Sequence, residues 1–383
     1  MTDLHLLHVI DGIGASGGAE RSLASMASEL SDRGIELDIA YLAPRTGLRD
    51  ELEASGARLF SLVGRGGLAG WTWRLRRLVA ERRPDLIHTT LFNSDVAGRT
   101  SAMLTRVPVV STLAGVPYDL RRNMDPTVAR WKIRAARELD RVTARAVRRF
   151  HAVTEHVADV MSERLRVSRD RIEVIPRGRD ARRLGVRTPE RRALVRRRLE
   201  IDESDPVLLV VSRHEYQKGV DVAIEALPSI IRATPRAHLL VAGRPGKLTP
   251  RLREATRRLG VEGSVSFLGT RDDVPDLLCA ADVFVLPSRW EGIGGVLLEA
   301  MALETPIVAS DIPPVREVIG TSGGGVLVPV EDPESLADGV VGVVSDREKA
   351  VRSARLAHER FVSEFSIEII TDRMITFYEK ALS

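Results

Sequence analysis

The stretch DVFVLPSRWEGIGGVLLEAMALETPIVASD, residues 282–311, decides the fold that we expect for this chain. Its first part, VFVL at 283–286, is an apolar run typical of a buried parallel strand, and Gly292, Gly294 and Gly295 follow it. Residues 296–303 carry apolar side chains at helical spacing, and 306–310 form a second apolar run. The stretch therefore predicts a strand, a glycine loop, a helix and a strand, which is the repeating unit of a parallel α/β sheet.

Two carboxylates flank the predicted glycine loop. Loops at the carboxyl ends of parallel strands bind ligands in such sheets, and the N–H groups at the start of the next helix attract anions. Glu291 precedes the glycines, and Glu299 lies about one turn into the helix. Ionised carboxylates accept hydrogen bonds, which suits the hydroxyl pairs of a sugar or a ribose. The stretch is therefore expected to bind a diphosphate that joins two sugars.

A second loop carries two cations. Arg213 and Lys218 follow another apolar run, in the sequence SRHEYQKG at 212–219. A forked guanidinium and a compact ammonium on one loop before a helix can clamp a diphosphate. Surface charge that caps the helix is the alternative. We expect the diphosphate reading because the two cations end a strand in the same half of the chain as Glu291 and Glu299.

The element EGIGGVLLE, residues 291–299, resembles the Glu-x7-Glu element of retaining GT-B glycosyltransferases of the family-4 type. AMA at 300–302 and TPIVAS at 305–310 are also similar to that family. The resemblance implies the GT-B fold, an α/β architecture with two Rossmann-like domains facing across a cleft. It also implies transfer of a hexose from a UDP- or GDP-linked donor to a hydroxyl acceptor, with retention of configuration and without an essential metal or a cofactor.

The resemblance assigns roles to residues of this chain. Glu291, Arg213 and Lys218 would be catalytic, with Glu291 on the donor sugar and the two cations on the leaving diphosphate. Glu299 would bind the ribose hydroxyls; an ordinary surface glutamate is the alternative. The other donor-binding residues that the resemblance implies are Gly17, Gly18, Arg271, Val274, Gly292, Ile293, Gly294 and Gly295.

Three positions depart from the family pattern. Ala114 stands where the family often has a histidine beside the reacting sugar, and Ile293 replaces a common phenylalanine. Glu304 replaces a helix-ending glycine that relieves left-handed strain, which should alter local geometry more than chemistry. Ala114 is placed at the acceptor side, and His88 at the end of its strand, or Asn93 or Asp95 in the next loop, could meet the acceptor, although His88 also fits a hydrogen-bonded structural role. A small-molecule, glycan or lipid-linked acceptor stays open.

Length and repetition predict two domains. At 383 residues the chain is long for one core, and apolar runs alternate with helical spacing in two series. We expect a Rossmann-like acceptor domain at 1–178, a linker with a solvated basic helix at 179–205, and a Rossmann-like nucleotide-sugar domain at 206–365. By analogy with the family, a C-terminal helix at 366–383 should pack back on the first domain.

Composition narrows the function classes. A net charge of +4 argues against a nucleic-acid-binding protein, and no run of about 18 apolar residues is present to span a membrane. Cys279 is the only cysteine, which excludes an internal disulfide and favours a reducing, cytoplasmic location. The first residues lack the cationic region of a signal peptide. No histidine or acid cluster has metal-ligand spacing, so no metal site is predicted.

Other functions were weighed against transfer. GIGASG at 12–17 satisfies the G-x-G-x-x-G pattern of dinucleotide-binding dehydrogenases. Those enzymes need an acid at the end of the second strand, but that strand ends AYLA at 40–43, with Asp38 inside it. A nucleotide-sugar epimerase on the same fold remains an alternative, as does a membrane-binding or polyanion-binding module built on the basic segment 121–149.

Aromatic and basic residues lie together in two predicted helices, WTWRLRR at 71–77 and WKIR at 131–134. Such faces can lie on an anionic membrane, here at its inner face, which would suit a lipid-linked acceptor. We expect instead the plainer arrangement, in which the tryptophans face the core and the arginines face solvent.

Overall fold

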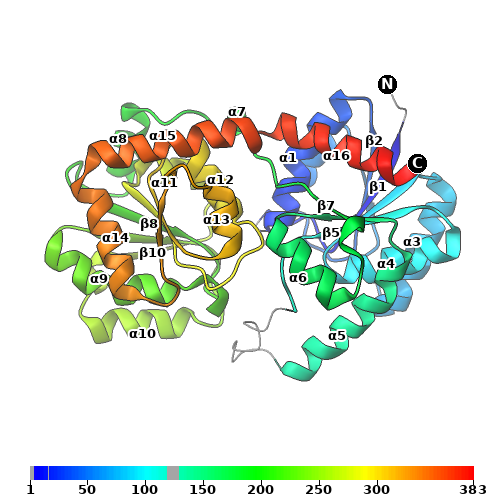
Figure 1. The fold of residues 1–383 in the computed structure, drawn as a ribbon, viewed down its shortest axis with the longest axis horizontal. Helices are drawn as coiled ribbons and strands as arrows, with labels where there is room; N and C mark the ends of the chain where they lie inside the picture. Colours follow the sequence, from blue (N-terminus) through cyan, green and yellow to red (C-terminus); the bar gives the residue numbers. More distant parts are fainter. Residues whose placement is uncertain (1–3, 16, 119–128) are drawn as a thin grey trace. The chain divides into compact units, whose positions relative to one another are not determined.

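The computed structural model describes residues 4–15, 17–118 and 129–383. The chain divides into two compact units, which we call unit 1 (Met1–Arg179 with Ser366–Ser383) and unit 2 (Asp180–Phe365). Each unit is a parallel β-sheet with helices packed on it (Figure 1). The predicted class, α/β with two Rossmann-like domains, is confirmed.

Within its described residues, unit 1 contains a seven-stranded parallel sheet in the order β3-β2-β1-β4-β5-β6-β7. In the register of the central pair, His8 lies opposite His88. The strands are β1 (His5–Ile10), β2 (Glu36–Tyr41), β3 (Arg58–Ser61), β4 (Leu86–Thr90), β5 (Val109–Leu113), β6 (Arg149–Ala152) and β7 (Ile172–Val174).

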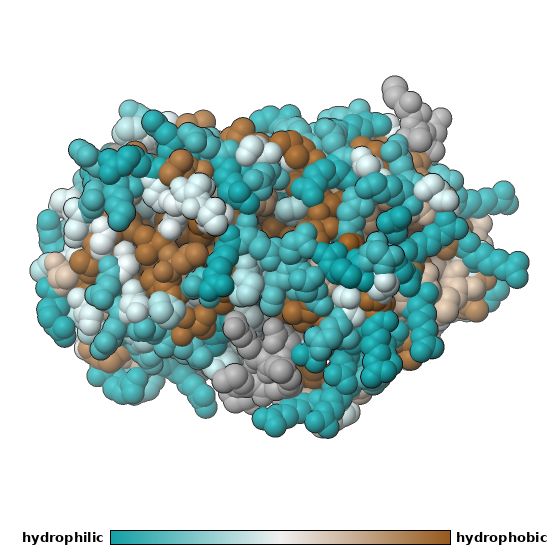
Figure 2. All heavy atoms as spheres, in the orientation of Figure 1, coloured by the Kyte–Doolittle hydropathy of each residue, from teal (hydrophilic) through white to brown (hydrophobic). Residues whose placement is uncertain are grey.

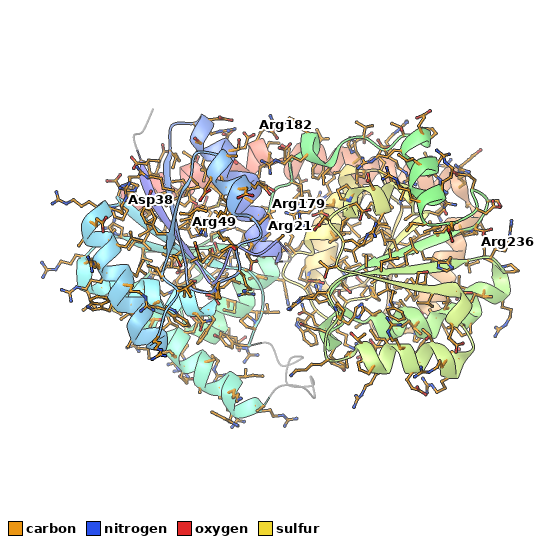
Figure 3. All side chains as sticks on the ribbon, turned by 180° about the vertical axis from the view of Figure 1, so that it is seen from behind. Arg21, Asp38, Arg49, Arg179, Arg182 and Arg236 are labelled. Atoms are coloured by element: carbon orange, nitrogen blue, oxygen red, sulfur yellow. The ribbon has the colours of Figure 1, made fainter. Side chains whose placement is uncertain are left out.

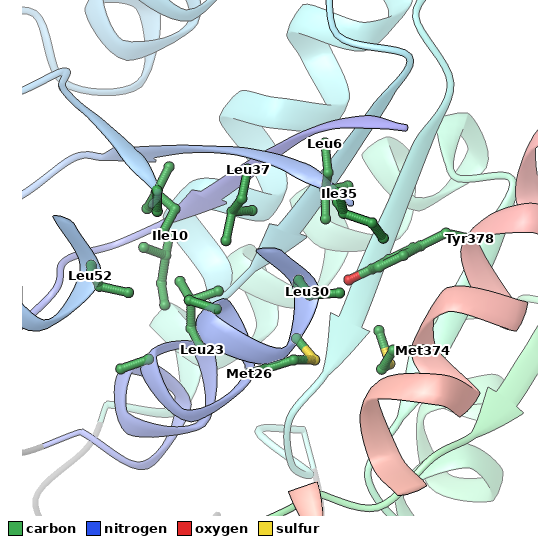
Figure 4. Close-up of a cluster of buried hydrophobic side chains, with 14 of the residues drawn as sticks. Leu6, Ile10, Leu23, Met26, Leu30, Ile35, Leu37, Leu52, Met374 and Tyr378 are labelled. Carbon is green, nitrogen blue, oxygen red and sulfur yellow. The ribbon is translucent and has the colours of Figure 1, made fainter. Parts of the chain in front are cut away.

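The C-terminal helix α16 (Ile367–Leu382) belongs to unit 1, where it packs against α1 (Gly18–Asp32). Apolar residues at helical spacing line both facing surfaces, and Met26 and Leu30 of α1 lie beside Met374 and Tyr378 of α16 (Figure 4). The other helices of the unit are α2 (Arg49–Ala54), α3 (Gly67–Arg82), α4 (Phe92–Thr105), α5 (Arg130–Thr143) and α6 (Glu155–Leu165).

Unit 2 has a six-stranded parallel sheet in the order β10-β9-β8-β11-β12-β13, all within described residues. Its strands are β8 (Val207–Val211), β9 (His238–Ala242), β10 (Val265–Gly269), β11 (Val283–Leu286), β12 (Ile307–Ser310) and β13 (Val326–Val328). Its helices include α9 (Val220–Ala233), α10 (Thr249–Leu259), α11 (Val274–Ala280), α12 (Gly295–Ala302), α13 (Pro313–Ile319), α14 (Pro333–Ser345) and α15 (Arg347–Glu364). Apolar side chains of α9 and α14 pack on this sheet. Figure 2 shows apolar side chains ringed by hydrophilic ones on the viewed face of the unit.

Residues 179–205 were predicted to form a linker, whereas the structure groups the residues from 180 onward with unit 2. The segment forms α7 (Ala181–Leu184) and α8 (Pro189–Arg198), and α8 packs against α11. Arg196 is fully buried and pairs with Asp282 at 2.6 Å, and its Nε donates to the carbonyl oxygen of Ala280 at the end of α11. Arg196 is therefore a packing residue of unit 2, since it satisfies the buried Ala280 carbonyl group and shares the partly exposed Asp282 carboxylate with Arg192.

None of the helices in the described part of the chain combines the length and the apolar character that crossing a bilayer requires.

Candidate functional site

In unit 2 the strand order reverses between β8 and β11, and the loops after these two strands carry most of the predicted donor residues. Ligands of open α/β sheets bind at such a switch point, outside the carboxyl ends of the strands. The loop after β8 holds Arg213 and Lys218, and the loop after β11 holds Glu291. The topology thus brings together residues more than 70 positions apart, as the separation of Lys218 from Glu291 shows.

Lys218 and Glu291 form an ion pair, with Nζ 2.6 Å from Oε1. Ser288 donates a hydrogen bond to the same carboxylate oxygen at 2.7 Å. Glu291 is buried, and the Lys218 side chain is only 18% exposed. An ammonium group has three N–H donors, so this pair orients Lys218 without excluding a phosphate as a further partner.

Close approach of the two loops requires glycine at position 219. Gly219 has φ of 62° at the start of α9, in the left-handed region. A Cβ at this position would overlap the carbonyl oxygen of Pro287, at the end of β11. Gly219 therefore lets the loop that carries Lys218 lie against the loop that carries Glu291.

The glycine loop leads directly into α12. Gly294 adopts φ of 77° as the residue before the helix, Gly295 is the first helical residue, and Ile293 is buried as a packing residue. The N–H groups and the positive end of the helix dipole at this position favour an anion. Glu299 lies further along α12 and is partly exposed.

Arg213 and Arg271 are each paired with an acid of their own loop. Arg213 donates to Glu215 at 2.8 Å and keeps a side chain that is 42% exposed. Arg271 forms two hydrogen bonds with Asp273, at 2.8 and 2.5 Å, which hold the pKa of the Asp273 carboxyl below its usual value. Arg271 and Val274, the first residue of α11, follow β10, an edge strand two positions from β8. The structure therefore does not place them beside the Lys218–Glu291 pair.

Sequence reasoning did not single out Ser288 or Arg289 in the same loop. The Arg289 side chain is 8% exposed and pairs with Asp221 and Glu331. Burial alone would lower the pKa of this guanidinium, but its hydrogen bonds to the two carboxylates raise it, so Arg289 stays charged. The only feature of the sequence that could have pointed to Arg289 is that it lies two residues before Glu291.

In unit 1 the strand order reverses between β1 and β4, and Asp11 lies at that switch point. The Asp11 carboxylate accepts hydrogen bonds from Asn93 Nδ2 at 2.8 Å and from Ser94 N at 2.9 Å. The predicted acceptor residue Asn93 is exposed, and the preceding Leu91 has a left-handed φ of 80°. Strained non-glycine residues cluster at functional sites, so the turn at 91–94 is a candidate for acceptor binding. Sequence reasoning had not singled out Asp11 as part of it.

The predicted glycines of unit 1 mark the start of α1. Gly17 precedes the helix and Gly18 is its first residue. A Cβ at Gly17 would overlap the Glu20 carboxylate, and one at Gly18 would lie 3.0 Å from Arg177 Nη1. Both positions thus lie where side chains already crowd the backbone.

His88 is buried, and both of its ring nitrogens have partners. Nδ1 lies 2.8 Å from Tyr378 Oη, and Nε2 lies 2.7 Å from Thr112 Oγ1. These contacts are those of a structural imidazole, and a role in acceptor binding stays a prediction. Ala114, immediately after β5, adds no polar side chain at that strand end.

One group among the described residues has the geometry for a metal ion: His5, Glu36 and Asp38, at the amino ends of β1 and β2 (Figure 3 labels Asp38). Arg58 and Arg82 each donate to Asp38 at 2.8 Å. The carboxylate is already neutralised, which favours an ion-pair cluster, and the group lies at the sheet edge opposite to Asp11.

Two hollows lie away from these loops. A cavity of about 50 Å³ in unit 1 is lined by residues of α1 and α16 and by His8, His88 and His151. A hollow of about 870 Å³ in unit 2 includes Pro206 and Asp282, at the amino ends of its strands. Neither contains a residue predicted to bind the donor, and we place the site by the switch-point loops because the polar groups converge there.

Comparison with known proteins gives a consistent result for both units. Residues 16–183 match the family model described as Glycosyltransferase Family 4, and residues 192–360 match the one described as Glycosyl transferases group 1. The chain is 28% identical to 2-deoxystreptamine N-acetyl-D-glucosaminyltransferase of Streptomyces fradiae, over 96% of this chain and 92% of that protein.

Two further comparisons are with proteins whose names give different nucleotide sugars. The chain is 33% identical to a GDP-mannose-dependent monoacylated alpha-(1-6)-phosphatidylinositol monomannoside mannosyltransferase of Corynebacterium glutamicum, over 53% of this chain and 54% of that protein. The crystal structure of Anabaena Alr3699/HepE in complex with UDP-glucose matches with a TM-score of 0.84 and 22% identity, covering 98% of this chain and 99% of that one. The structural match shows the GT-B fold.

Proposed function

The chain belongs to the group 1, family-4 type glycosyltransferases, and from this premise we propose that it transfers a hexose from a UDP- or GDP-linked donor to a hydroxyl acceptor, with retention of configuration. The observation that carries the proposal is the Lys218–Glu291 ion pair at the switch point of unit 2, beside the glycine loop that begins α12. A cation, a buried carboxylate and a helix N-terminus at one point suit a nucleoside diphosphate sugar.

The main task of this site is to stabilise the charge that builds up on the leaving diphosphate. Lys218, Arg213 and the backbone N–H groups of 292–295 supply positive charge and donors for it, without a metal. Glu291 accepts hydrogen bonds from hydroxyl groups of the donor sugar, and Glu299 accepts them from the ribose. Retention of configuration comes to this chain from the family alone.

The remaining site residues have supporting roles in the proposal. Arg271 and Val274 border the nucleotide base. Gly17 and Gly18, at the start of α1, come to the donor-binding set from the family resemblance alone. The acceptor itself lies near His88 within β4, Asn93 at the start of α4 and Ala114 immediately after β5.

Titration calorimetry with UDP, GDP, ADP, TDP and NAD tests the donor site. We expect one nucleoside diphosphate to bind the wild-type chain, and Glu299→Ala and Arg213→Ala each to weaken it about tenfold or more, since a lost charged hydrogen bond costs about 1.5–3 kcal/mol. Binding of NAD alone, or of no nucleotide, would overturn the proposal. A sugar nucleotide converted to its epimer without any acceptor would show an epimerase instead.

We also propose that the acceptor is lipid-linked, because α5 exposes apolar and basic side chains together. Trp131 is 68% exposed, and Leu139 and Val142 lie further along the same helix at 39% and 58%. The expectation of core-facing tryptophans therefore does not hold for Trp131. Arg130, Lys132, Arg134, Arg137 and Arg141 lie on the same helix, and Figure 2 shows hydrophilic side chains along its viewed face. Such a helix suits an anionic bilayer.

Vesicle sedimentation tests this surface. The wild-type chain should sediment with phosphatidylglycerol vesicles and not with phosphatidylcholine vesicles, and Trp131→Ser should weaken the binding. Val186→Ser, at an apolar position of unit 2 that is 74% exposed, is the matched control and should bind like the wild type. Equal binding of Trp131→Ser and the wild type would remove α5 from the interface.

A further inference from the structure

Arg289 lies two residues before Glu291 in the loop after β11, and its side chain is almost completely buried. Its Nε donates to Glu331 Oε1 at 2.6 Å, and Nη1 and Nη2 donate to the two oxygens of Asp221 at 3.0 and 2.7 Å. Nη1 also donates to the backbone oxygen of Tyr216 at 2.7 Å. The guanidinium lies 4.0 Å from the centre of the Tyr216 ring, a cation–π contact.

These partners come from separate segments of unit 2. Tyr216 begins the short 3-10 helix Tyr216–Lys218 after β8, Asp221 is in the first turn of α9, and Glu331 follows β13. Arg289 itself follows β11, in the loop that carries Glu291. One side chain therefore joins the loop of Lys218 to the loop of Glu291 and braces both against neighbouring elements.

Backbone hydrogen bonds repeat the connection. The Arg289 N–H donates to the Gln217 carbonyl oxygen at 2.8 Å, and the Gln217 side-chain amide donates to the Trp290 carbonyl oxygen at 2.8 Å. Gln217 immediately precedes Lys218, and Trp290 immediately precedes Glu291. The backbone at both members of the ion pair is thus held by the Arg289 segment.

The backbone at Glu331 is held in an unfavourable conformation by its surroundings. Glu331 has φ of 61°, a left-handed value that a glutamate adopts only at a cost. Such a conformation persists where surrounding contacts determine it, and strain of this kind gathers at functional sites. The contact of Glu331 with Arg289 is one such contact.

We propose that Arg289 is a positioning residue for the donor diphosphate: it does not touch the donor, and it acts by holding the 216–218 turn so that Lys218 points at the phosphates. This inference rests on the proposed function of the same loops. A lysine at 289 could not replace it, because only the planar fork of arginine can bond both Asp221 oxygens and Glu331 together.

A double-mutant cycle tests whether Arg289 acts through Lys218. The probe is whichever of UDP, GDP, ADP and TDP binds the wild-type chain most tightly, and its Kd is measured by calorimetry for the wild type, Arg289→Met, Lys218→Ala and the double variant. We expect Arg289→Met to raise the Kd about tenfold, and we expect the double variant to bind about as weakly as Lys218→Ala alone, because coupled residues are not additive. Transfer activity should show kcat reduced about 10-fold to 100-fold.

Controls separate positioning from a general effect on folding. Arg236→Met removes an exposed arginine of unit 2 that pairs only with its surface neighbour Asp205 in the described contacts, and it should leave the Kd and kcat unchanged (Arg236 is labelled in Figure 3). Glu331→Gln removes the negative charge of one partner of Arg289 while keeping the side-chain shape and an acceptor oxygen, so it gives a folded variant if Arg289→Met does not fold. It should weaken binding in the same direction, and Arg289→Lys should not restore it.

Two results would overturn the proposal. One is a folded Arg289→Met variant that binds the nucleotide and turns over like the wild type below its unfolding temperature. If Arg289→Met does not fold, the same result for a folded Glu331→Gln variant counts equally. Either result would make the cluster merely structural. The other is full additivity with Lys218→Ala, which would mean that Arg289 acts on the donor by another route. A wild-type chain that binds no nucleoside diphosphate would instead refute the proposed function itself.

Discussion

Lowering the pH from about 7 to about 5 should destabilise unit 1, because three histidines are buried in its sheet without charge. Burial, together with a smaller repulsion from His151 when that ring is protonated, lowers the pKa of His8 to about 3. Burial lowers the pKa of His151 to about 4, opposed by its bond to the Ile175 carbonyl and assisted by Arg177 and Arg373. The pKa of His88 is also well below 6.5, through burial and the two neighbouring histidines.

The sign and size follow from proton linkage. In the unfolded chain these histidines bind protons below about pH 6.5, whereas in the folded unit His8 and His151 do not until about pH 3 to 4. Their stabilising contribution is therefore complete above pH 6.5 and is lost as the pH falls below that value. Between about pH 7 and pH 5, His8 and His151 should each cost about 2 kcal/mol, and His88 adds to the loss. A domain has only about 5–15 kcal/mol to lose.

Urea unfolding followed by tryptophan fluorescence measures this loss. Of the four tryptophans, Trp71, Trp73 and Trp131 are in unit 1, so the signal reports mainly on that unit. His8→Leu is the informative variant, because neither ring nitrogen of His8 has a hydrogen-bond partner among the described residues. It removes a titrating group without breaking a bond, and it should reduce the pH slope of the unfolding free energy by about 1.4 kcal/mol per pH unit.

Met374→Leu is the matched control, since Met374 lines the same cavity and does not titrate. It should shift the urea midpoint equally at each pH and leave the slope unchanged. An identical slope for His8→Leu and the wild type would refute the reasoning, because it would show that His8 titrates alike in the folded and unfolded chain.

Three further substitutions test the backbone and the packing of unit 2. Glu304 has a left-handed φ of 50°, so Glu304→Gly should raise the unfolding free energy by about 1 kcal/mol; a loss of stability would contradict this. Arg196→Met should cost about 1–3 kcal/mol in denaturant, because buried carbonyl oxygens such as that of Ala280 lose their donor while Asp282 keeps its ion pair with Arg192, and a change below about 0.5 kcal/mol would show that these bonds are unimportant. Gly219→Ala should strain the loop against Pro287, lower the free energy of unfolding by about 1–3 kcal/mol and weaken nucleotide binding. Gly342→Ala, which has open space around it, should cause no such strain and leave nucleotide binding unchanged. Equal effects of the two alanines would count against the close approach of the loops.

The strands of both sheets could be predicted from the sequence because burial on both faces of a parallel sheet leaves a continuous apolar run. VFVL at 283–286 became β11 as predicted, and the glycines after it lead into α12. At Glu304 a change of local geometry was expected, and the structure instead keeps a left-handed φ of 50°, the region that a helix-ending glycine would adopt. Features that depend on local sequence patterns, such as β11 and the start of α12, could therefore be predicted.

Contacts between distant segments could not be predicted in the same way. Arg289 bonds to Asp221 and Glu331, which lie 68 and 42 positions away, so no spacing in the sequence connects them. The arginines of α8 suggested a solvated helix, because composition does not show that Asp282 and the end of α11 lie beside them. Lys218 and Glu291 were predicted as separate ligands of one donor, and the structure adds the bond between them.

Hydrogen exchange with and without the best-binding nucleoside diphosphate would test the central claim most directly. The account predicts slower exchange in the two switch-point loops of unit 2, residues 212–219 and 287–299, and the same experiment on Lys218→Ala should show much weaker protection there. Protection confined to residues 12–18 of unit 1, or protection in neither loop of unit 2 at a saturating nucleotide concentration, would contradict the assignment of these loops as the donor site.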